Sequence, residues 1–169
     1  NRLIKNHNNI IKTQMFQIYP TEEQKIVIFN WMNECVKVYN KSIDMYNNNE
    51  LNLNYMISKL VVFNKLYNNV DKNAPYDMLT NEVQVCCSNI KSCLSNLNNN
   101  NIKFINMKHK NTSRCQSVLI PKKSLNSKGF FTSILGNMEG FKNIDTEIID
   151  CDSRLIYDKI YNRFYLKCP

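Results

Sequence analysis

Apolar residues recur at helical spacing between residue 21 and residue 97. Apolar positions three or four residues apart share one face of a helix, so the pattern predicts amphipathic helices that bury a common core. The first helix is predicted to begin at Thr21, which forms a capping-box pattern with Gln24. Pro75 separates the last helix from the second. The three predicted apolar stripes are Ile28, Met32, Cys35, Tyr39 and Tyr46, then Leu53, Met56, Leu60, Phe63 and Tyr67, then Leu79, Val83, Cys86, Ile90, Leu94 and Leu97.

Short extended runs flank this helical block on both sides. Residues 11–18 form a predicted strand that ends at Tyr19-Pro20. The last two runs are predicted to form a hairpin that turns at residues 159–162. Beyond residue 100 the predicted strands are 117–121, 129–135, 144–150, 153–158 and 163–168. The expected fold class is therefore α+β, a β domain with helices inserted after its first strand.

Positive charge is concentrated in one third of the chain. The formal net charge is +8, and residues 83–138 contain no Asp or Glu. A local patch of one sign attracts polyanions, because each neutralised phosphate releases counterions. We therefore favour nucleic-acid binding over a solvated basic face that has no partner. The eight basic residues of this stretch equal the whole excess charge, and they are Lys91, Lys103, Lys108, Lys110, Arg114, Lys122, Lys123 and Lys128.

The segment from residue 104 to residue 114 carries the densest basic cluster. Lys108, His109, Lys110 and Arg114 lie within seven residues, with hydroxyl and amide donors between them. Such groups suit contacts with phosphate and ribose, which position a nucleic acid without reading its bases. Amide side chains nearby, such as Gln84 and Gln116, have the donors and acceptors that base edges require.

Residues for catalysis or metal binding do not form a recognisable pattern. The seven Cys include no CxxC pair, and the chain has only two His, His7 and His109. Zinc sites need paired ligands at short spacing, so we expect free thiols in a reducing, intracellular compartment. No Gly-rich phosphate loop or GxSxG motif is present. We expect no catalytic residue, no metal ligand and no cofactor in this chain.

Five carboxylates near the C-terminus require separate consideration, because two-metal nucleases use clustered carboxylates. They are Asp145, Glu147, Asp150, Asp152 and Asp158. Asp145 and Glu147 alternate with Ile144, Thr146 and Ile148, which favours the solvated face of a strand over a metal site. No run of about 18 apolar residues occurs, so no membrane partner is expected.

Four segments, in order along the chain, resemble the N-terminal half of TnpB proteins and of their eukaryotic and giant-virus relatives, the Fanzor nucleases. The first is KTQMFQIYPTEEQ at residues 12–24, and the second is VYN at residues 38–40. The third is RCQSVLIP at residues 114–121. The fourth is DSRLIY at residues 152–157 with RFYL at residues 163–166. Together they extend over nearly the whole chain.

This resemblance implies a wedge-like antiparallel β-barrel, residues 1–19 and 102–169, interrupted by a helical recognition domain of residues 20–101. In the family these domains hold a guide RNA, the RNA–DNA heteroduplex and a short motif in the target DNA duplex. Base pairing then reads the sequence, while the protein reads shape and the short motif. The family's nuclease domain, with Mg²⁺ and Zn²⁺, would follow Pro169. The chain is expected to be a fragment of such a nuclease or a repurposed remnant.

The resemblance also assigns nucleic-acid-binding residues. It places Thr80, Asn81 and Gln84 on the helix that faces the target-adjacent duplex. It further implies contacts by Lys12, Gln14, Tyr39 and Asn40, which lie in the family's first two motifs. The expected contacts with the RNA or heteroduplex backbone are Lys108, His109, Lys110, Arg114, Lys122 and Lys123.

Two other functions stay open at this level. The first is a stand-alone DNA-binding regulator that works without RNA, although the helix at residues 79–97 offers only Lys91 as a basic residue. The second is a non-catalytic structural or interaction protein whose basic patch pairs with an acidic partner. The expected location is the nucleus or a viral factory for a eukaryotic or giant-virus protein, and the cytoplasm otherwise.

Overall fold

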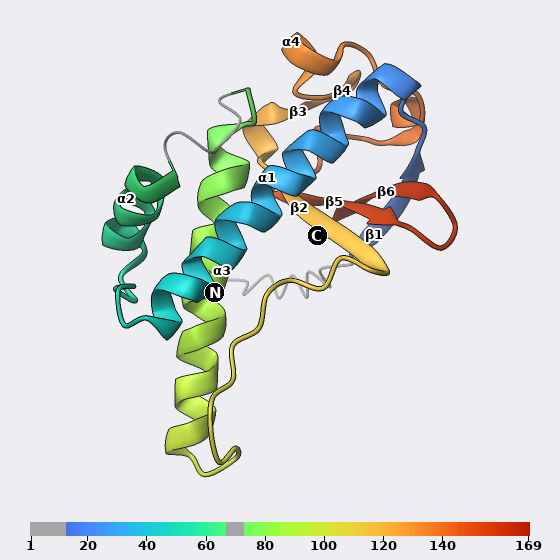
Figure 1. Cartoon of the computed structure of the whole chain (residues 1–169). Helices are drawn as coiled ribbons and strands as arrows, with labels where there is room; N and C mark the ends of the chain where they lie inside the picture. The colour runs from blue at the N-terminus through green and yellow to red at the C-terminus, as the bar shows by residue number, and fades with distance from the viewer. Residues whose placement is uncertain (1–12, 67–72) are drawn as a thin grey trace, which may run out of the picture.

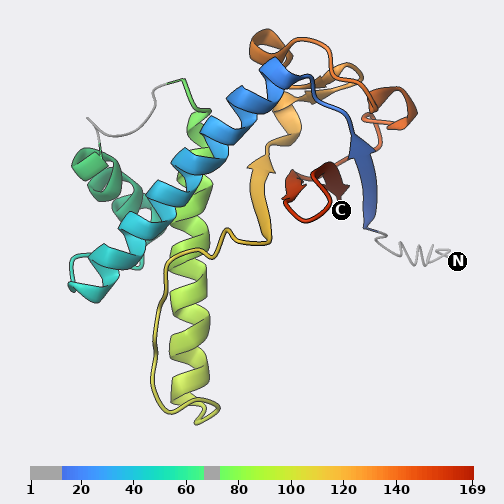
Figure 2. The same cartoon turned by 45° about the vertical axis from the view of Figure 1, so that its right-hand side comes forward.

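The computed structural model describes residues 13–66 and 73–169, so Lys12 and Tyr67 lie outside the described residues. Three helices follow the first strand β1 (Gln14–Ile18), and they precede β2 (Cys115–Ile120). They are α1 (Glu22–Asn47), α2 (Tyr55–Leu66) and α3 (Tyr76–Asn98). This arrangement confirms the predicted α+β class with helices inserted after the first strand. Figures 1 and 2 show α1 crossing α3, with the sheet at one end of the helical block.

The main sheet is antiparallel and open. Its strand order is β1-β6-β5-β2, with β5 at Ser153–Asp158 and β6 at Arg163–Cys168. β5 and β6 form the predicted hairpin. The described residues do not form the expected closed barrel, because β1 and β2 occupy the two edges of the sheet. A barrel requires that every strand has a neighbour on both sides, and two of the predicted strands do not form as expected.

The stretch from residue 129 to residue 135 is only partly a strand. β3 (Leu125–Asn126) pairs with β4 (Gly129–Phe130) in a short second sheet. Phe131 then has φ of 46°, a left-handed conformation that ends the extended run, and α4 (Thr132–Leu135) follows. The prediction of a strand over residues 129–135 is therefore wrong beyond its first two residues.

Residues 144–150 do not form the predicted strand. Ile144 and Ile149 are both buried although they are five residues apart, whereas Ile148 is 69% exposed. The Asp145 carboxylate accepts a hydrogen bond from the Glu147 backbone N–H at 3.2 Å. Such a local turn competes with extended pairing. Asp145 and Glu147 are thus exposed on a loop and not on one face of a strand.

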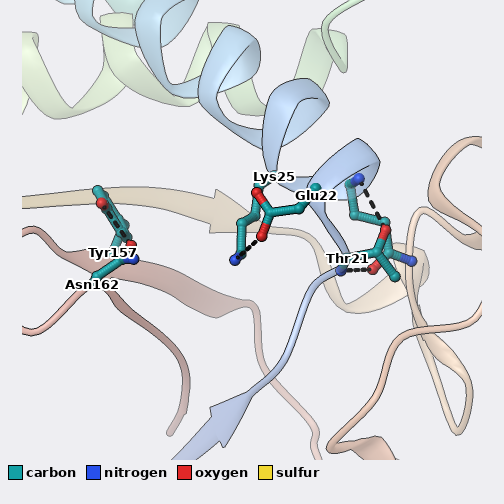
Figure 3. A network of polar contacts seen from close by, with 6 residues as sticks. Thr21, Glu22, Lys25, Tyr157 and Asn162 are labelled. Carbon is teal, nitrogen blue, oxygen red and sulfur yellow. Dashed lines mark hydrogen bonds and ion pairs between the residues drawn. The ribbon is translucent and has the colours of Figure 1, made fainter.

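The start of α1 is fixed by the predicted capping box (Figure 3). The Gln24 N–H donates to Thr21 Oγ1 at 3.3 Å, and the Thr21 N–H donates to Gln24 Oε1 at 2.9 Å. Gln24 Nε2 also donates to the carbonyls of Leu135 and Asn137 at 2.9 and 2.8 Å. The same side chain therefore caps the helix and joins it to the loop after α4.

The apolar stripes predicted for α1 and α3 are buried over most of their length and pack into the core, together with residues of the sheet and of the loops after β4. Ile28, Met32 and Cys35 of α1 are buried in one cluster with residues of α3 and the sheet. Phe29 packs on the sheet, with its ring 4.8 Å from that of Tyr157 and 5.5 Å from that of Phe164, between centroids. Aromatic pairs at these distances add to the stabilisation from burial alone.

The stripe predicted for α2 is only partly correct, because Leu53 and Phe63 pack against the core and the two residues between them do not. Met56 and Leu60 are 58% and 59% exposed, whereas Ser58, Val62 and Leu66 are buried. Ser58 is accommodated because its hydroxyl donates to the carbonyl of Asn52. A helix that is apolar on several sides gives no unique stripe in the sequence, so the contact with α1 and α3 decides which face is buried. No helix within the described ranges has the length and apolar character of a membrane span.

Candidate nucleic-acid interface

A groove of about 750 Å³ lies between α3 and the turn that follows β2. Thr80, Asn81 and Gln84 line it from one side of α3, since Thr80 and Asn81 precede Gln84 by four and three residues. Lys122 and Lys123 line it from a 3-10 turn at Lys122–Ser124. The structure thus brings together five of the predicted site residues from two distant parts of the chain. Pro121 ends β2 before this turn, since proline lacks the N–H that a strand ladder needs.

Both lysines of the groove pair with exposed carboxylates. Lys123 Nζ lies 2.5 Å from Asp77 Oδ2, and Lys122 Nζ lies 2.9 Å from Asp150 Oδ1. The Asp152 carboxylate accepts from the Lys122 N–H at 2.9 Å. Hydrogen bonding and charge from Lys122 lower the pKa of Asp150. Exposed pairs contribute little to stability because water screens their charges, so a phosphate can replace these carboxylates at little cost.

The three α3 side chains differ in how available they are. Thr80 is buried, and its hydroxyl donates to the carbonyl of Asp77 at 3.3 Å. Asn81 Oδ1 is buried without a hydrogen-bond partner among the described residues. A buried acceptor of this kind costs free energy until a donor reaches it. Gln84 is exposed and lines the groove, which leaves its amide accessible to a ligand.

A second group of predicted residues meets where the linker after α3 lies on the helices. The Lys110 N–H donates to Asn40 Oδ1 at 2.9 Å, and its ammonium lies 5.0 Å from the ring centroid of Tyr39. His109 Nε2 lies 2.7 Å from Asp44 Oδ1. In Figures 1 and 2 this linker runs back along α3 toward β2. These contacts fasten the linker to α1.

The Lys110 ammonium also pairs with Glu82 of α3. The Glu82 side chain is fully buried, and Lys110 is 27% exposed. Burial raises the pKa of Glu82, and the nearby Lys110 opposes that shift. Glu82 Oε1 has no hydrogen-bond partner among the described residues. This pair holds the linker on α3. Removing either residue would leave the charge of the other without its partner, which destabilises the fold.

The other predicted residues lie outside both groups. Lys108 and Arg114 are exposed at the two ends of the basic segment, and Gln14 is exposed at the start of β1. Gln116 lines a different groove of about 550 Å³ between α1 and β2. Sequence reasoning missed the polar residues of α1 that share this groove, Asn30, Asn33 and Lys37. In the sequence they are recognisable by their spacing of three and four residues, which places them on one polar face of α1.

No group of three or more His, Cys, Asp or Glu residues in the described part of the chain could hold a metal ion. All seven cysteines are free. Burial raises the pKa of the Cys86 thiol to about 12 and raises that of Cys35 further. Both thiols therefore stay protonated at neutral pH and act as small apolar groups.

No protein-family model matches the chain. It is similar to three TnpB-like proteins of Acanthamoeba polyphaga mimivirus, at 25%, 23% and 23% identity. Each similarity covers 94% of this chain. The chain spans about a third of the length of these relatives, 34%, 34% and 33%. Similarity over nearly the whole chain supports a relationship to the TnpB family.

Proposed function

We propose that this chain is the N-terminal, nucleic-acid-binding part of a transposon-derived RNA-guided DNA endonuclease of the TnpB/Fanzor type. One observation carries the proposal. Amide and hydroxyl side chains of α3 share a groove with two lysines that come from the turn after β2. Base edges are read by amides, and phosphates are bound by lysines, so the groove has both chemistries that duplex recognition requires.

In this proposal the groove binds the short duplex motif beside the DNA target. Gln84 is the principal reader, because its amide is exposed and can form two hydrogen bonds with an adenine edge. Asn81 would gain a donor for its buried oxygen. Lys122 and Lys123 would exchange Asp150 and Asp77 for phosphates. The backbone contacts would then add affinity without sequence preference.

The exposed basic residues outside the groove are proposed to contact the guide RNA and the RNA–DNA heteroduplex. Lys108 and Arg114 are the best placed, because both side chains are exposed. Cleavage is assigned to a C-terminal nuclease domain, where Mg²⁺ and Zn²⁺ would bind. No group of three or more His, Cys, Asp or Glu within the described residues could hold a metal ion, so both metals are assigned to that domain.

Selection from a duplex library tests the groove. The purified chain is mixed with DNA duplexes that carry a randomised segment, and the bound fraction is sequenced. We expect a short preferred motif, and we expect Gln84→Ala to relax one position of it by about 1–3 kcal/mol. Ser88→Ala is the matched control, since Ser88 is exposed one helical turn further along α3 and does not line the groove. A preference that Gln84→Ala leaves unchanged would contradict the proposal.

A second experiment separates the RNA-guided protein from a regulator that binds DNA alone. Binding is measured with the RNA that is transcribed beside the gene, with an unrelated RNA of equal length, and with duplex DNA. We expect the cognate RNA to bind most tightly at physiological salt. Sequencing the transcript past the codon for Pro169 provides an independent check, because an RNA-guided nuclease requires a reading frame that continues into a carboxylate-bearing domain.

A further inference from the structure

The tip of the β5–β6 hairpin carries apolar side chains that face solvent. Ile160 and Tyr161 are 61% and 67% exposed, so neither side chain is packed in the core. The tip spans residues 158–163, and it is not part of the groove between α3 and β2. Two exposed apolar side chains do not by themselves mark an interaction site, so the groups around Tyr161 decide whether the tip is one.

The backbone of this tip is held in a defined conformation. Asp158 Oδ1 accepts hydrogen bonds from the N–H groups of Ile160 and Tyr161, at 2.9 and 3.4 Å. Asn162 has φ of 51°, a left-handed conformation that asparagine tolerates better than most residues. The Tyr157 hydroxyl donates to Asn162 Oδ1 at 3.1 Å (Figure 3). The tip is thus rigid enough to present Tyr161 without a large ordering cost on binding.

One cation lies against the exposed ring, and two more basic residues belong to the tip or are bonded to its backbone. The Arg163 guanidinium lies 6.0 Å from the centroid of the Tyr161 ring. The Lys159 N–H donates to the carbonyl of Arg114 at 3.0 Å, which brings Arg114 next to the tip. None of Arg114, Lys159 and Arg163 forms an ion pair with another described residue. The only carboxylate of the tip, Asp158, accepts from the turn backbone.

We infer that the β5–β6 tip binds an unpaired nucleotide, whose base stacks on Tyr161 while the adjacent phosphates contact Arg114, Lys159 and Arg163. An exposed aromatic ring among cations is the arrangement that binds single-stranded nucleic acid, because every base has a face that can stack. A duplex hides its base faces, so the site selects single strands. The inference rests on the proposed function only in taking nucleic acid as the ligand. Two apolar residues among three cations offer too little apolar area for a lipid surface to be preferred.

The test compares the parent chain with Tyr161→Ala and Tyr161→Phe by fluorescence anisotropy. The probes are a labelled 12-nucleotide oligouridylate and a blunt RNA duplex of equal length. We expect Tyr161→Ala to weaken binding of the single strand by about 5- to 100-fold and Tyr161→Phe to keep it, because stacking needs the ring and not the hydroxyl. Tyr76→Ala is the matched control, since Tyr76 is 56% exposed at the start of α3 and lies outside both the tip and the groove. This control is expected to bind as the parent does.

A double variant measures the phosphate contacts. Lys159→Ala with Arg163→Ala should lower the slope of log binding constant against log salt by about 1.4 for the single strand, about 0.7 per contact. Equal binding by Tyr161→Ala and the parent would overturn the inference, and so would equal losses for single strand and duplex. Binding of the parent to anionic vesicles that depends on Tyr161 would also overturn it in favour of a lipid surface.

The inference and the proposed function can fail separately. If Tyr161→Ala binds as the parent does while the Gln84-dependent duplex preference persists, only the tip assignment is overturned. If the parent chain binds none of the nucleic acids at physiological salt, the proposed function fails and the inference fails with it. Since Tyr161 is exposed, its variants should unfold at the parent's urea midpoint, which is measured on the same samples.

Discussion

Two short basic segments, residues 108–110 and residues 122–123, both consist of consecutive basic residues but have different surroundings in the fold. In the first, which we call the linker segment, Lys110 pairs with the fully buried Glu82. In the second, the groove segment, Lys123 is 72% exposed and pairs with Asp77, which is 42% exposed. Both segments were predicted to contact nucleic acid, and both roles remain predictions.

The comparison teaches that burial of the partner decides what a lysine can do. An exposed pair contributes about 0–1 kcal/mol, and its lysine can exchange the carboxylate for a phosphate. Breaking a buried pair by removing one partner costs about 3–5 kcal/mol, because a charge is left uncompensated. The linker segment therefore serves first to attach the linker to α3, whereas the groove segment keeps its cations available to a ligand.

The largest expected difference between the segments is in stability. We expect Lys110→Ala to lower the free energy of unfolding at pH 7 by about 3–5 kcal/mol, because the Glu82 carboxylate loses its cation. The cation–π contact with Tyr39 is lost as well. Urea unfolding followed by circular dichroism gives the value.

Lys123→Ala is the matched control for this measurement. It breaks a pair of similar geometry at an exposed position, so its cost should stay below about 1 kcal/mol. Equal losses for the two variants would show that the buried pair has no special role, and the distinction between the segments would then be wrong.

Features that depend on nearby residues could be predicted from the sequence. The capping box at Thr21, the core stripes of α1 and α3, and the β5–β6 hairpin were all expected and are all present. Each is determined by residues within a few positions of one another, so periodicity and turn chemistry suffice. The basic segments were likewise visible, but their partners were not.

Features that depend on distant residues could not be predicted. The buried face of α2 is chosen by its contacts with α1 and α3, and α2 presents apolar residues on more than one side. The partner of Lys110 is Glu82, 28 residues earlier, and no local pattern links them. The groove joins Gln84 with Lys122 only because β2 ends beside α3. Such pairings follow from packing of whole elements, which single-sequence patterns do not encode.

The linker segment and the groove segment also differ in how the pKa values of their carboxylate partners respond to the fold. Burial raises the pKa of Glu82 above its usual 4.5, so between the two values the folded chain holds a proton that the unfolded chain has lost. Stability should therefore fall as the pH rises above 4.5 and through the raised pKa, by at most about 1.4 kcal/mol per pH unit. Lys122 lowers the pKa of Asp150 below its usual 3.8. The stability that this pair contributes is therefore kept above pH 3.8 and is lost as the pH falls below that value.

Two variants separate these opposite responses. Glu82→Gln should flatten the decline of stability above pH 4.5, and Asp150→Asn should leave that decline intact. Urea midpoints measured between pH 4.5 and pH 8 provide the profile. If the parent and Glu82→Gln have parallel profiles, burial of Glu82 does not control the dependence.

The smallest effect is the most direct test of the groove segment. Lys122→Ala should lower the slope of log binding constant against log salt for duplex DNA by about 0.9, the value for one phosphate contact. Lys65→Ala is the matched control, because Lys65 is 42% exposed and pairs with Glu50, while Lys122 is 47% exposed. Lys65 does not line the groove, so its variant should keep the parent's slope.

The salt dependence of DNA binding can also be measured for the linker segment, provided that both residues of the buried pair are replaced together. Lys110→Met combined with Glu82→Leu removes both charges and keeps much of the packed volume, a change that is often nearly neutral for stability. Since Lys110 is directed to Glu82 and not to solvent, this double variant should keep the parent's salt slope for duplex DNA. A slope lowered by about 0.9 would mean that Lys110 contacts phosphate despite its buried partner, and the two segments would then act alike.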